Sequence, residues 1–233
     1  MDVERVESGI PGLDKLIEGG FVRNSMNLLT GGTGTGKTIF ANQFILHGLK
    51  NDENGVYITL EQSPEEIKAD MSRFGWDFDK YIREKKCQFE YLTITNFDDL
   101  KFNIFRAISE VKAERLVIDS ISLVSLSFEG KSLSELRHKI FDLMKDLKAK
   151  NITSLLVSET PDDGERKLSR FGMEEFVADS VIKIHYTGIG GEQFRNVEIR
   201  KMRRTDHSQG FHPLIFTKNG LSVKGEPISV LMK

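Results

Sequence analysis

The chain has 233 residues, of which 39% are hydrophobic and 29% charged, so it is long enough and apolar enough to bury one large core. Its net charge of -2 at pH 7 excludes a protein that binds polyanions through overall charge, so any contact with nucleic acid has to come from a local patch. A single cysteine, Cys87, excludes internal disulfides and a multi-cysteine metal site, and no segment approaches the roughly 18 apolar residues of a membrane span.

Short apolar runs recur along the chain, with segments of helical periodicity between them. Each run is too short for a helix and too continuous for a strand with one solvated face, so we predict strands buried on both faces and mostly parallel. The predicted strands are residues 26–30, 56–60, 115–119, 153–158 and 181–186.

The segments between these runs have the apolar spacing of helices. Residues 39–50, 100–111 and 133–147 are predicted helices, the last two clearly amphipathic. Ser63 and Ser132 each precede a glutamate at the third helical position, which predicts a capping box at the start of a helix. The alternation of strand and helix predicts a doubly wound α/β fold with a mostly parallel sheet flanked by helices.

The helical pattern fades after residue 186. Apolar runs at 194–202, 212–216 and 221–223, separated by turns that contain glycine, predict C-terminal strands that are mostly antiparallel. No repeat or low-complexity linker marks a domain boundary. We therefore expect residues 1–233 to form a single domain.

The stretch GGTGTGKT directly follows the first predicted strand and matches the phosphate-binding pattern of glycine, four residues, glycine, lysine, then serine or threonine. Glycines let the chain curl so that backbone N–H groups point at phosphate oxygens, and the following helix adds partial positive charge at its N-terminus. Lys37 can reach the terminal phosphates, and the Thr38 hydroxyl suits Mg²⁺. The predicted nucleotide-binding residues are Gly31, Gly32, Thr33, Gly34, Thr35, Gly36, Lys37, Thr38 and Ile39.

Two other interpretations of this stretch are an ordinary glycine-rich turn and a dinucleotide-binding loop. The dinucleotide pattern fails on spacing, because Gly32-x-Gly34 is followed three places on by Lys37 instead of glycine. The strand before the stretch and the helical pattern after it favour a phosphate loop over a simple turn.

Two carboxylates at the ends of predicted strands are candidates for a hydrolytic site. Asp119 ends the run 115–119, where a mononucleotide fold directs it at the water shell of Mg²⁺. The next residue is Ser120, whereas many nucleotidases have a water-activating glutamate there. Glu61 follows the run 56–60 at the same predicted sheet edge, so it is the candidate general base. The simpler alternatives are an aspartate that caps a turn and an exposed glutamate.

Several segments together resemble a single KaiC-type domain of the RecA superfamily of ATPases. These segments are SGIPGLDKLIEGG (8–20), the phosphate loop, LEQSPEEI (60–67), RFGWDFDKY (73–81), LVIDS (116–120), RFGMEEFVADSVI (170–182) and IRKMRRTDH (199–207). The resemblance covers nearly the whole chain and implies a RecA-type core that forms rings, commonly hexamers, with ATP between adjacent subunits.

The resemblance also implies roles for single residues. Lys37 and Thr38 would hold the phosphates and Mg²⁺, Asp119 would be the Walker B aspartate, and Glu61 would be the first of a catalytic glutamate pair. Gln62 departs from the second member of the pair, and an amide can position water but cannot take its proton. A single copy of the domain argues against clock or autokinase roles, which belong to members with two copies.

The basic segment KMRRTDH (201–207) also resembles archaeal RadA paralogues. In a regular strand, Lys201 and Arg203 would share a face with Ile199, and Met202 would lie on the opposite face. The KaiC resemblance implies that Lys201, Arg203 and His207 cross a subunit interface to a neighbour's nucleotide.

Two alternatives for this segment stay open, a solvated strand end and a patch that contacts DNA phosphates. The DNA hypothesis would use Arg200, Lys201, Arg203 and Arg204, but no aromatic residues interleave with them to stack on bases.

The sequence therefore predicts a Mg²⁺-dependent ATPase that binds ATP and assembles with itself, in a hexameric ring by resemblance and with further protein partners possible. One alternative is a nucleotide-sensing scaffold with little hydrolysis, and another is a RadA-paralogue-like accessory protein of DNA repair. Because the N-terminus has no apolar leader, we expect a soluble, cytoplasmic protein.

Overall fold

A computed structural model describes residues 3–94, 96–128, 132–160, 167–189 and 192–227. The strands are β1 (Arg5–Val6), β2 (Phe21–Val22), β3 (Met26–Gly31), β4 (Gly55–Thr59), β5 (Cys87–Tyr91), β6 (Arg115–Asp119), β7 (Thr153–Glu159), β8 (Ser180–Ile189), β9 (Glu192–Met202), β10 (Phe211–Thr217) and β11 (Gly220–Val223). The helices are α1 (Lys37–Lys50), α2 (Pro64–Ser72), α3 (Phe78–Arg83), α4 (Phe97–Val111), α5 (Leu133–Lys148) and α6 (Glu174–Val177), with 3₁₀ helices η1 (Asp14–Ile17) and η2 (Ile121–Phe128).

One large sheet organises the described residues, with the strand order β11-β10-β9-β8-β3-β7-β6-β4-β5. The strands from β5 through β8 run parallel to one another, whereas β8, β9, β10 and β11 pair antiparallel. The predicted fold class is confirmed, including the switch to antiparallel strands after residue 186. The small pair β1–β2 forms a separate two-stranded sheet.

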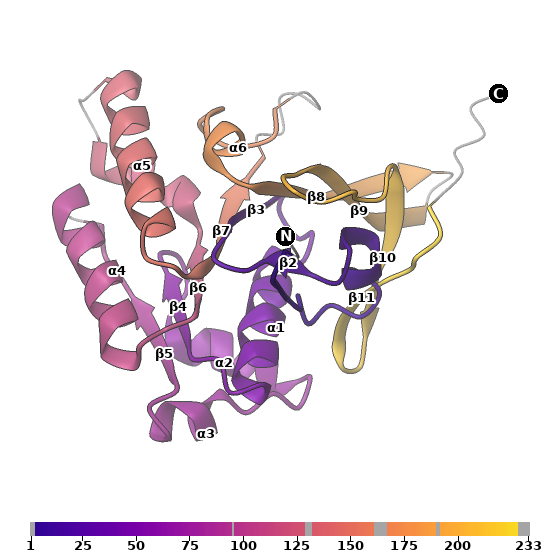
Figure 1. Cartoon of the computed structure of the whole chain (residues 1–233), viewed down its shortest axis with the longest axis horizontal. Coiled ribbons are helices and arrows are strands. Elements are labelled where there is room, and N and C mark those ends of the chain that lie inside the picture. Colours follow the sequence, from indigo (N-terminus) through magenta and orange to yellow (C-terminus); the bar gives the residue numbers. More distant parts are fainter. Residues whose placement is uncertain (1–2, 95, 129–131, 161–166, 190–191, 228–233) are drawn as a thin grey trace.

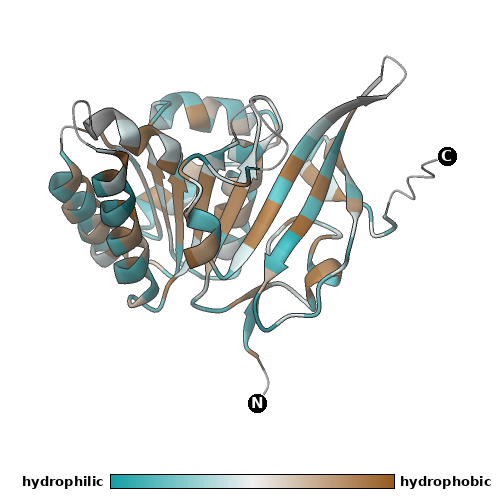
Figure 2. Cartoon of the chain, turned by 90° about the horizontal axis from the view of Figure 1, so that it is seen from above, coloured by the Kyte–Doolittle hydropathy of each residue, from teal (hydrophilic) through white to brown (hydrophobic). Residues whose placement is uncertain are grey.

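Two hydrophobic cores lie on opposite faces of the parallel strands. On β6, Val117 packs in the core beneath α1, α2 and α3, whereas Leu116 and Ile118 pack in the core beneath α4 and α5. Helices lie on both sides of these strands (Figure 1). Apolar residues fill the strands, and the outer faces of the helices are hydrophilic (Figure 2). Burial on both faces explains why the predicted strands read as continuous apolar runs.

Both predicted capping boxes are present. The Ser63 hydroxyl accepts a hydrogen bond from the Glu66 N–H at the start of α2, and Ser132 and Glu135 repeat the arrangement at α5. Satisfying the first free N–H groups in this way fixes where each helix begins.

β5 was not predicted, and its position explains why. It is the last strand beside β4 in the sheet order, and its sequence CQFEY is mostly half-buried. An edge strand of this kind lacks the continuous apolar run of a strand with neighbours on both sides.

The interpretation of 194–202 as one regular strand was wrong. Val181 pairs with Lys201, but the next residue, Ile182, pairs with Ile199, so Arg200 is an extra residue in a β-bulge. The bulge shifts the alternation, and Met202 therefore packs in the same core as Ile199 instead of on the opposite face. Arg203 lies just beyond the end of β9.

A buried arginine joins α1 to the sheet. Arg115 is 2% exposed, and its Nη2 lies 2.5 Å from Glu53 Oε2. Its Nη1 donates to the carbonyls of Glu7 and Phe44 at 3.0 and 2.9 Å. This packing requires Gly48 on α1, because a Cβ at that position would lie 2.4 Å from the Arg115 Cδ.

Among the described helices, none has the length and apolar character needed to cross a membrane.

Candidate functional site

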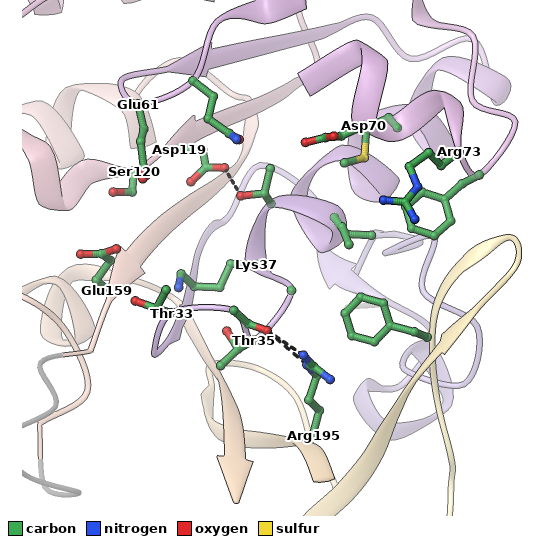
Figure 3. Close-up of a pocket in the computed structure, with 18 of the residues that line it drawn as sticks. Thr33, Thr35, Lys37, Glu61, Asp70, Arg73, Asp119, Ser120, Glu159 and Arg195 are labelled. Atoms are coloured by element: carbon green, nitrogen blue, oxygen red, sulfur yellow. Dashed lines mark hydrogen bonds between the residues drawn. The ribbon is translucent and has the colours of Figure 1, made fainter. Parts of the chain in front are cut away.

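A cavity of about 690 Å³ opens at the carboxyl ends of four parallel strands. The phosphate loop follows β3, Glu61 follows β4, Asp119 ends β6 and Glu159 ends β7, and all of these line the cavity (Figure 3). Ligands of open α/β sheets bind at this edge. The structure therefore brings together the predicted loop and both predicted carboxylates.

The phosphate loop owes its shape to two glycines with left-handed backbone. Gly34 has φ +72° and Gly36, which precedes α1, has φ +105°. Gly31 is needed for close packing, since a Cβ there would lie 2.6 Å from the carbonyl oxygen of Ile184 on β8. These positions disfavour any residue with a side chain.

Lys37, the first residue of α1, turns back over the loop. Its Nζ donates to the carbonyls of Gly31 and Gly32 at 2.9 and 2.8 Å. Burial lowers the pKa of Lys37, and the nearby carboxylates of Glu159, Asp119 and Glu61 oppose that shift. A partly desolvated ammonium over a row of backbone N–H groups is suited to bind phosphate. The predicted loop residues Thr33, Thr35 and Ile39 also line the cavity.

Asp119 is buried and held by two hydroxyls. Thr38 Oγ1 donates to Asp119 Oδ2 at 2.9 Å, and the Tyr57 hydroxyl donates to the same oxygen at 2.6 Å. Burial raises the pKa of Asp119 above its usual value, although both hydrogen bonds act in the opposite direction.

The residues present at Asp119 fit Mg²⁺. A hydroxyl and a carboxylate oxygen lie within hydrogen-bond distance of each other beside the phosphate loop, and both are hard oxygen ligands. The described residues contain no cluster of three or more His, Cys, Asp or Glu side chains arranged for a metal. Mg²⁺ needs no such cage, because it is usually held by one or two protein oxygens together with phosphates and water.

Glu61 faces the cavity from the end of β4. Partial desolvation raises its pKa, and the charges of Asp119 and Glu159 raise it further. A carboxylate with a raised pKa is a stronger base when ionised, which suits the abstraction of a proton from water. Gln62, the next residue along the chain, also lines the cavity.

The sequence reasoning missed a carboxylate and an entire wall of the cavity. Glu159 pairs with Gly31 across the β3–β7 ladder, and its place at the end of an apolar run was a signal that could have been used. The missed wall consists of residues from α2 and its end and from the antiparallel strands and the turn between β10 and β11: Asp70, Met71, Arg73, Phe74, Arg195, Phe216 and Lys218. Arg73 and Phe74 begin a segment that carries the family resemblance, but nothing in that segment indicated a place in the cavity.

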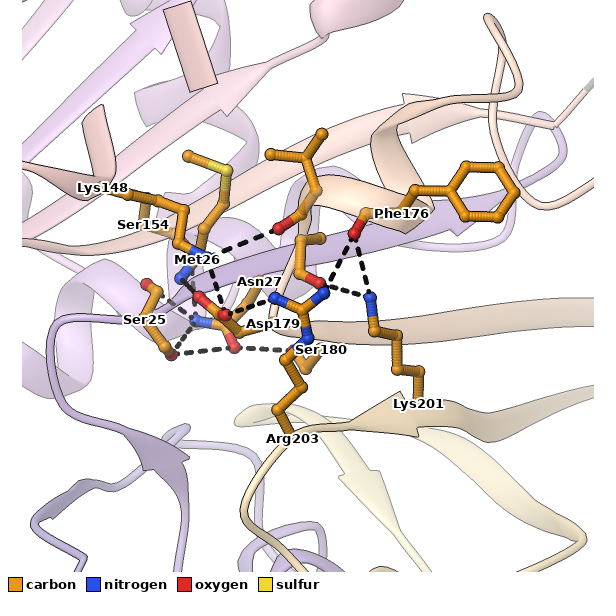
Figure 4. A network of polar contacts seen from close by, with 12 residues as sticks. Ser25, Met26, Asn27, Lys148, Ser154, Phe176, Asp179, Ser180, Lys201 and Arg203 are labelled. Atoms are coloured by element: carbon orange, nitrogen blue, oxygen red, sulfur yellow. Dashed lines mark hydrogen bonds and ion pairs between the residues drawn. The ribbon is translucent and has the colours of Figure 1, made fainter. Parts of the chain in front are cut away.

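Lys201 and Arg203 lie at the opposite edge of the sheet. Arg203 Nη1 is 3.4 Å from Asp179 Oδ1, and Asp179 in turn accepts the N–H of Met26, the first residue of β3 (Figure 4). Lys201 Nζ donates to the carbonyl oxygens of Glu175 and Ala178 at 2.8 and 2.7 Å.

Lys201 and Arg203 lie close together, although the regular strand alternation from which this was predicted was wrong. Both donate to the carbonyl of Phe176, Lys201 at 3.4 Å and Arg203 at 3.2 Å. His207 is not part of this group, because its described contact joins Nδ1 to the carbonyl of Ser208 at 3.1 Å. The phosphate loop lies beyond the other end of β3, so neither cation is part of the cavity in its own subunit.

The fold and the site define a P-loop ATPase domain of the RecA superfamily. A family model described as KaiC ATPase matches residues 6–227. The chain belongs to this KaiC family, whose general activity is the binding and hydrolysis of ATP.

Individual relatives agree with the family. A UPF0273 protein of Pyrococcus furiosus is 34% identical over an alignment of 238 positions, which covers 95% of this chain and 94% of that protein. The circadian clock protein KaiC3 of Synechocystis is 33% identical over an alignment of 234 positions, which covers 95% of this chain but 46% of that protein. The crystal structure of a KaiC-like protein from Pyrococcus horikoshii has a TM-score of 0.88 and 42% identity, covering 96% of this chain and 100% of that one.

Proposed function

We propose that this protein is a Mg²⁺-dependent ATPase and that residues 1–233 act as one ATPase domain. The observation that carries the proposal is the convergence of the phosphate loop, the Thr38–Asp119 pair and Glu61 on one cavity. The family match supports ATP as the nucleotide.

In the proposed reaction, the backbone N–H groups of the loop and the Lys37 ammonium bind the phosphates of ATP. Thr38 and Asp119 would hold Mg²⁺, which neutralises charge on the phosphate oxygens when it is bound. Glu61 would orient the attacking water and take its proton, and its raised pKa suits this role. Gln62 can position that water through its amide but cannot accept the proton, so turnover would depend on Glu61 alone.

We further propose that the protein assembles with itself, in a ring of the hexameric kind, with nucleotide between subunits. Lys201 and Arg203 lie at the sheet edge opposite the cavity, so they can approach a nucleotide only if it is bound by a neighbouring subunit. An arginine brought against the γ-phosphate in this way can raise the rate of hydrolysis by roughly 10³- to 10⁵-fold.

DNA binding through the same segment has less support. Lys201 is partly buried and donates to three backbone carbonyls of its own chain, and Arg203 is held by Asp179 and Phe176. These contacts would have to open for any phosphate, but DNA binding is further disfavoured by the net charge of -2 and by the lack of aromatic residues interleaved with the basic segment.

The test compares ATP binding with ATP hydrolysis in matched variants. Lys37→Ala should abolish tight ATP binding in calorimetry, whereas Lys50→Ala, at the exposed end of the same helix, should bind normally. Glu61→Gln should bind ATP but slow single-turnover hydrolysis by roughly 10²- to 10⁴-fold, the usual contribution of a general base. Glu65→Gln, exposed in the first turn of α2, is its control.

Unchanged ATP affinity in Lys37→Ala would refute the nucleotide site. If wild-type protein binds ATP but releases no phosphate, with or without single-stranded DNA, the scaffold hypothesis replaces the enzyme.

A further inference from the structure

Arg195 on β9 contacts the phosphate loop from outside. Its Nε and Nη2 both donate to the carbonyl oxygen of Gly34, at 3.2 and 3.0 Å (Figure 3). The two elements are 161 residues apart in the sequence, and the antiparallel strands bring them together. The forked guanidinium is the one cationic side chain that can donate two N–H groups to a single acceptor from fixed positions.

Two aromatic rings hold the guanidinium in place. Its Cζ lies 4.4 Å from the ring centroid of Tyr186, the residue paired with Arg195 across the β8–β9 ladder, and 4.6 Å from that of Phe216 on β10. Phe216 itself packs against the loop, since a Cβ at Gly36 would lie 3.1 Å from its Cζ. Stacking between two rings restricts the rotamers of Arg195 and partly removes its water.

Arg195 brings a positive charge to the cavity, which it also lines. Within the part of the chain that the structure describes, no carboxylate forms an ion pair with it. A positive charge beside a phosphate site adds to the potential that attracts an anionic nucleotide.

We propose that Arg195 is a positioning residue that prepares the phosphate loop to bind nucleotide, an inference that rests on the proposed function. The carbonyl of Gly34 and the N–H of Thr35 belong to the same peptide unit. In a loop whose N–H groups point at phosphate, the carbonyls point outward, and Arg195 binds one of them. A cation on the carbonyl polarises the peptide, so the Thr35 N–H becomes a stronger donor.

This role predicts an effect on nucleotide affinity more than on chemistry. Arg195→Ala removes two charge-assisted hydrogen bonds from the loop, so the affinities for ATP and ADP should both fall by roughly 10-fold. The KM for ATP should rise by a similar factor, while kcat at saturating ATP should stay within about twofold of wild type. Arg195→Lys keeps the charge but not the fork, and its affinity should be intermediate.

The experiment measures ATP and ADP binding by calorimetry, together with hydrogen exchange of the loop amides in nucleotide-free protein. Loop peptides should exchange faster in Arg195→Ala than in wild type, because the outer support of the loop is lost. The matched control is Arg200→Ala, an exposed arginine on the same strand whose partner is Glu198 at 2.9 Å. It should leave both measurements unchanged.

Three results would overturn the inference. Wild-type affinity in Arg195→Ala, with binding still lost in Lys37→Ala, would show that Arg195 has no such role although the nucleotide site is real. Wild-type affinity in Arg195→Lys, together with wild-type hydrogen exchange of the loop in Arg195→Ala, would show that only the positive charge matters and that Arg195 does not support the loop. Equal losses in Arg200→Ala would show a general electrostatic effect. Retained binding in Lys37→Ala would instead refute the proposed function itself.

Discussion

Gly48→Ala sets two opposing effects against each other on α1. In an ordinary helix interior, alanine stabilises relative to glycine by about 1 kcal/mol. Here the new Cβ would lie 2.4 Å from both Cδ and Nε of Arg115, a separation that real Cβ atoms do not adopt. Either α1 moves away from β6, or Arg115 leaves its contacts with Glu53, Glu7 and Phe44.

The larger effect should be the loss of the Arg115 contacts. Disrupting a buried, hydrogen-bonded ion pair costs about 3–5 kcal/mol when one charge is left without its partner. After subtracting the gain in helix propensity, we expect Gly48→Ala to lower the free energy of unfolding by about 2–4 kcal/mol. The assay is equilibrium unfolding in urea, at fixed protein concentration and without nucleotide.

Introducing Gly48→Ala into an Arg115→Met variant tests whether the clash with Arg115 causes the loss of stability. In Arg115→Met, which removes the guanidinium and leaves a flexible apolar side chain, Gly48→Ala should no longer destabilise and should add up to about 1 kcal/mol. The reasoning fails if Gly48→Ala is as stable as wild type, or if it destabilises both backgrounds equally.

Two further predictions concern the site. Tyr57→Phe removes the 2.6 Å hydrogen bond that orients Asp119, so half-maximal hydrolysis should need about 10-fold more Mg²⁺, and an unchanged Mg²⁺ titration would contradict this role. Arg203→Ala and Lys37→Ala subunits should each be inactive alone but regain part of the ATPase activity when mixed, since some interfaces then pair an intact loop with an intact arginine. If the subunits exchange and no mixture recovers phosphate release, Arg203 does not act on a neighbour.

Local patterns predicted the parallel half of the molecule well. The strand 115–119 was predicted with the bounds that the structure shows, and both capping boxes start helices where expected. One rule predicted that the candidate site residues would meet: parallel strands present their carboxyl ends at the same edge of the sheet. The structure places the phosphate loop, Asp119 and Glu61 around one cavity at that edge. Each of these features is encoded within a few consecutive residues.

The features that were missed depend on contacts between distant segments. The bulge at Arg200 places Ile199 and Met202 of β9 in one core, and no periodicity in β9 alone records it. Arg195 and Phe216 reach the phosphate loop only because β9 and β10 extend the sheet from β8, which lies beside β3. Arg115 was placed correctly at the start of a strand, but nothing local in the sequence indicates its burial against Gly48 and its ion pair with Glu53.

In an assembly of the proposed kind, β9 would connect two sites mechanically. Arg195 near one end contacts the subunit's own phosphate loop, and Arg203 just past the other end is about 25 Å away along the strand. A strand hydrogen-bonded on both sides transmits displacement along its axis with little extension. If Arg203 acts on a neighbouring subunit as proposed, movement of the loop when nucleotide leaves would shift this arginine. Hydrolysis at neighbouring sites would then be coupled instead of independent.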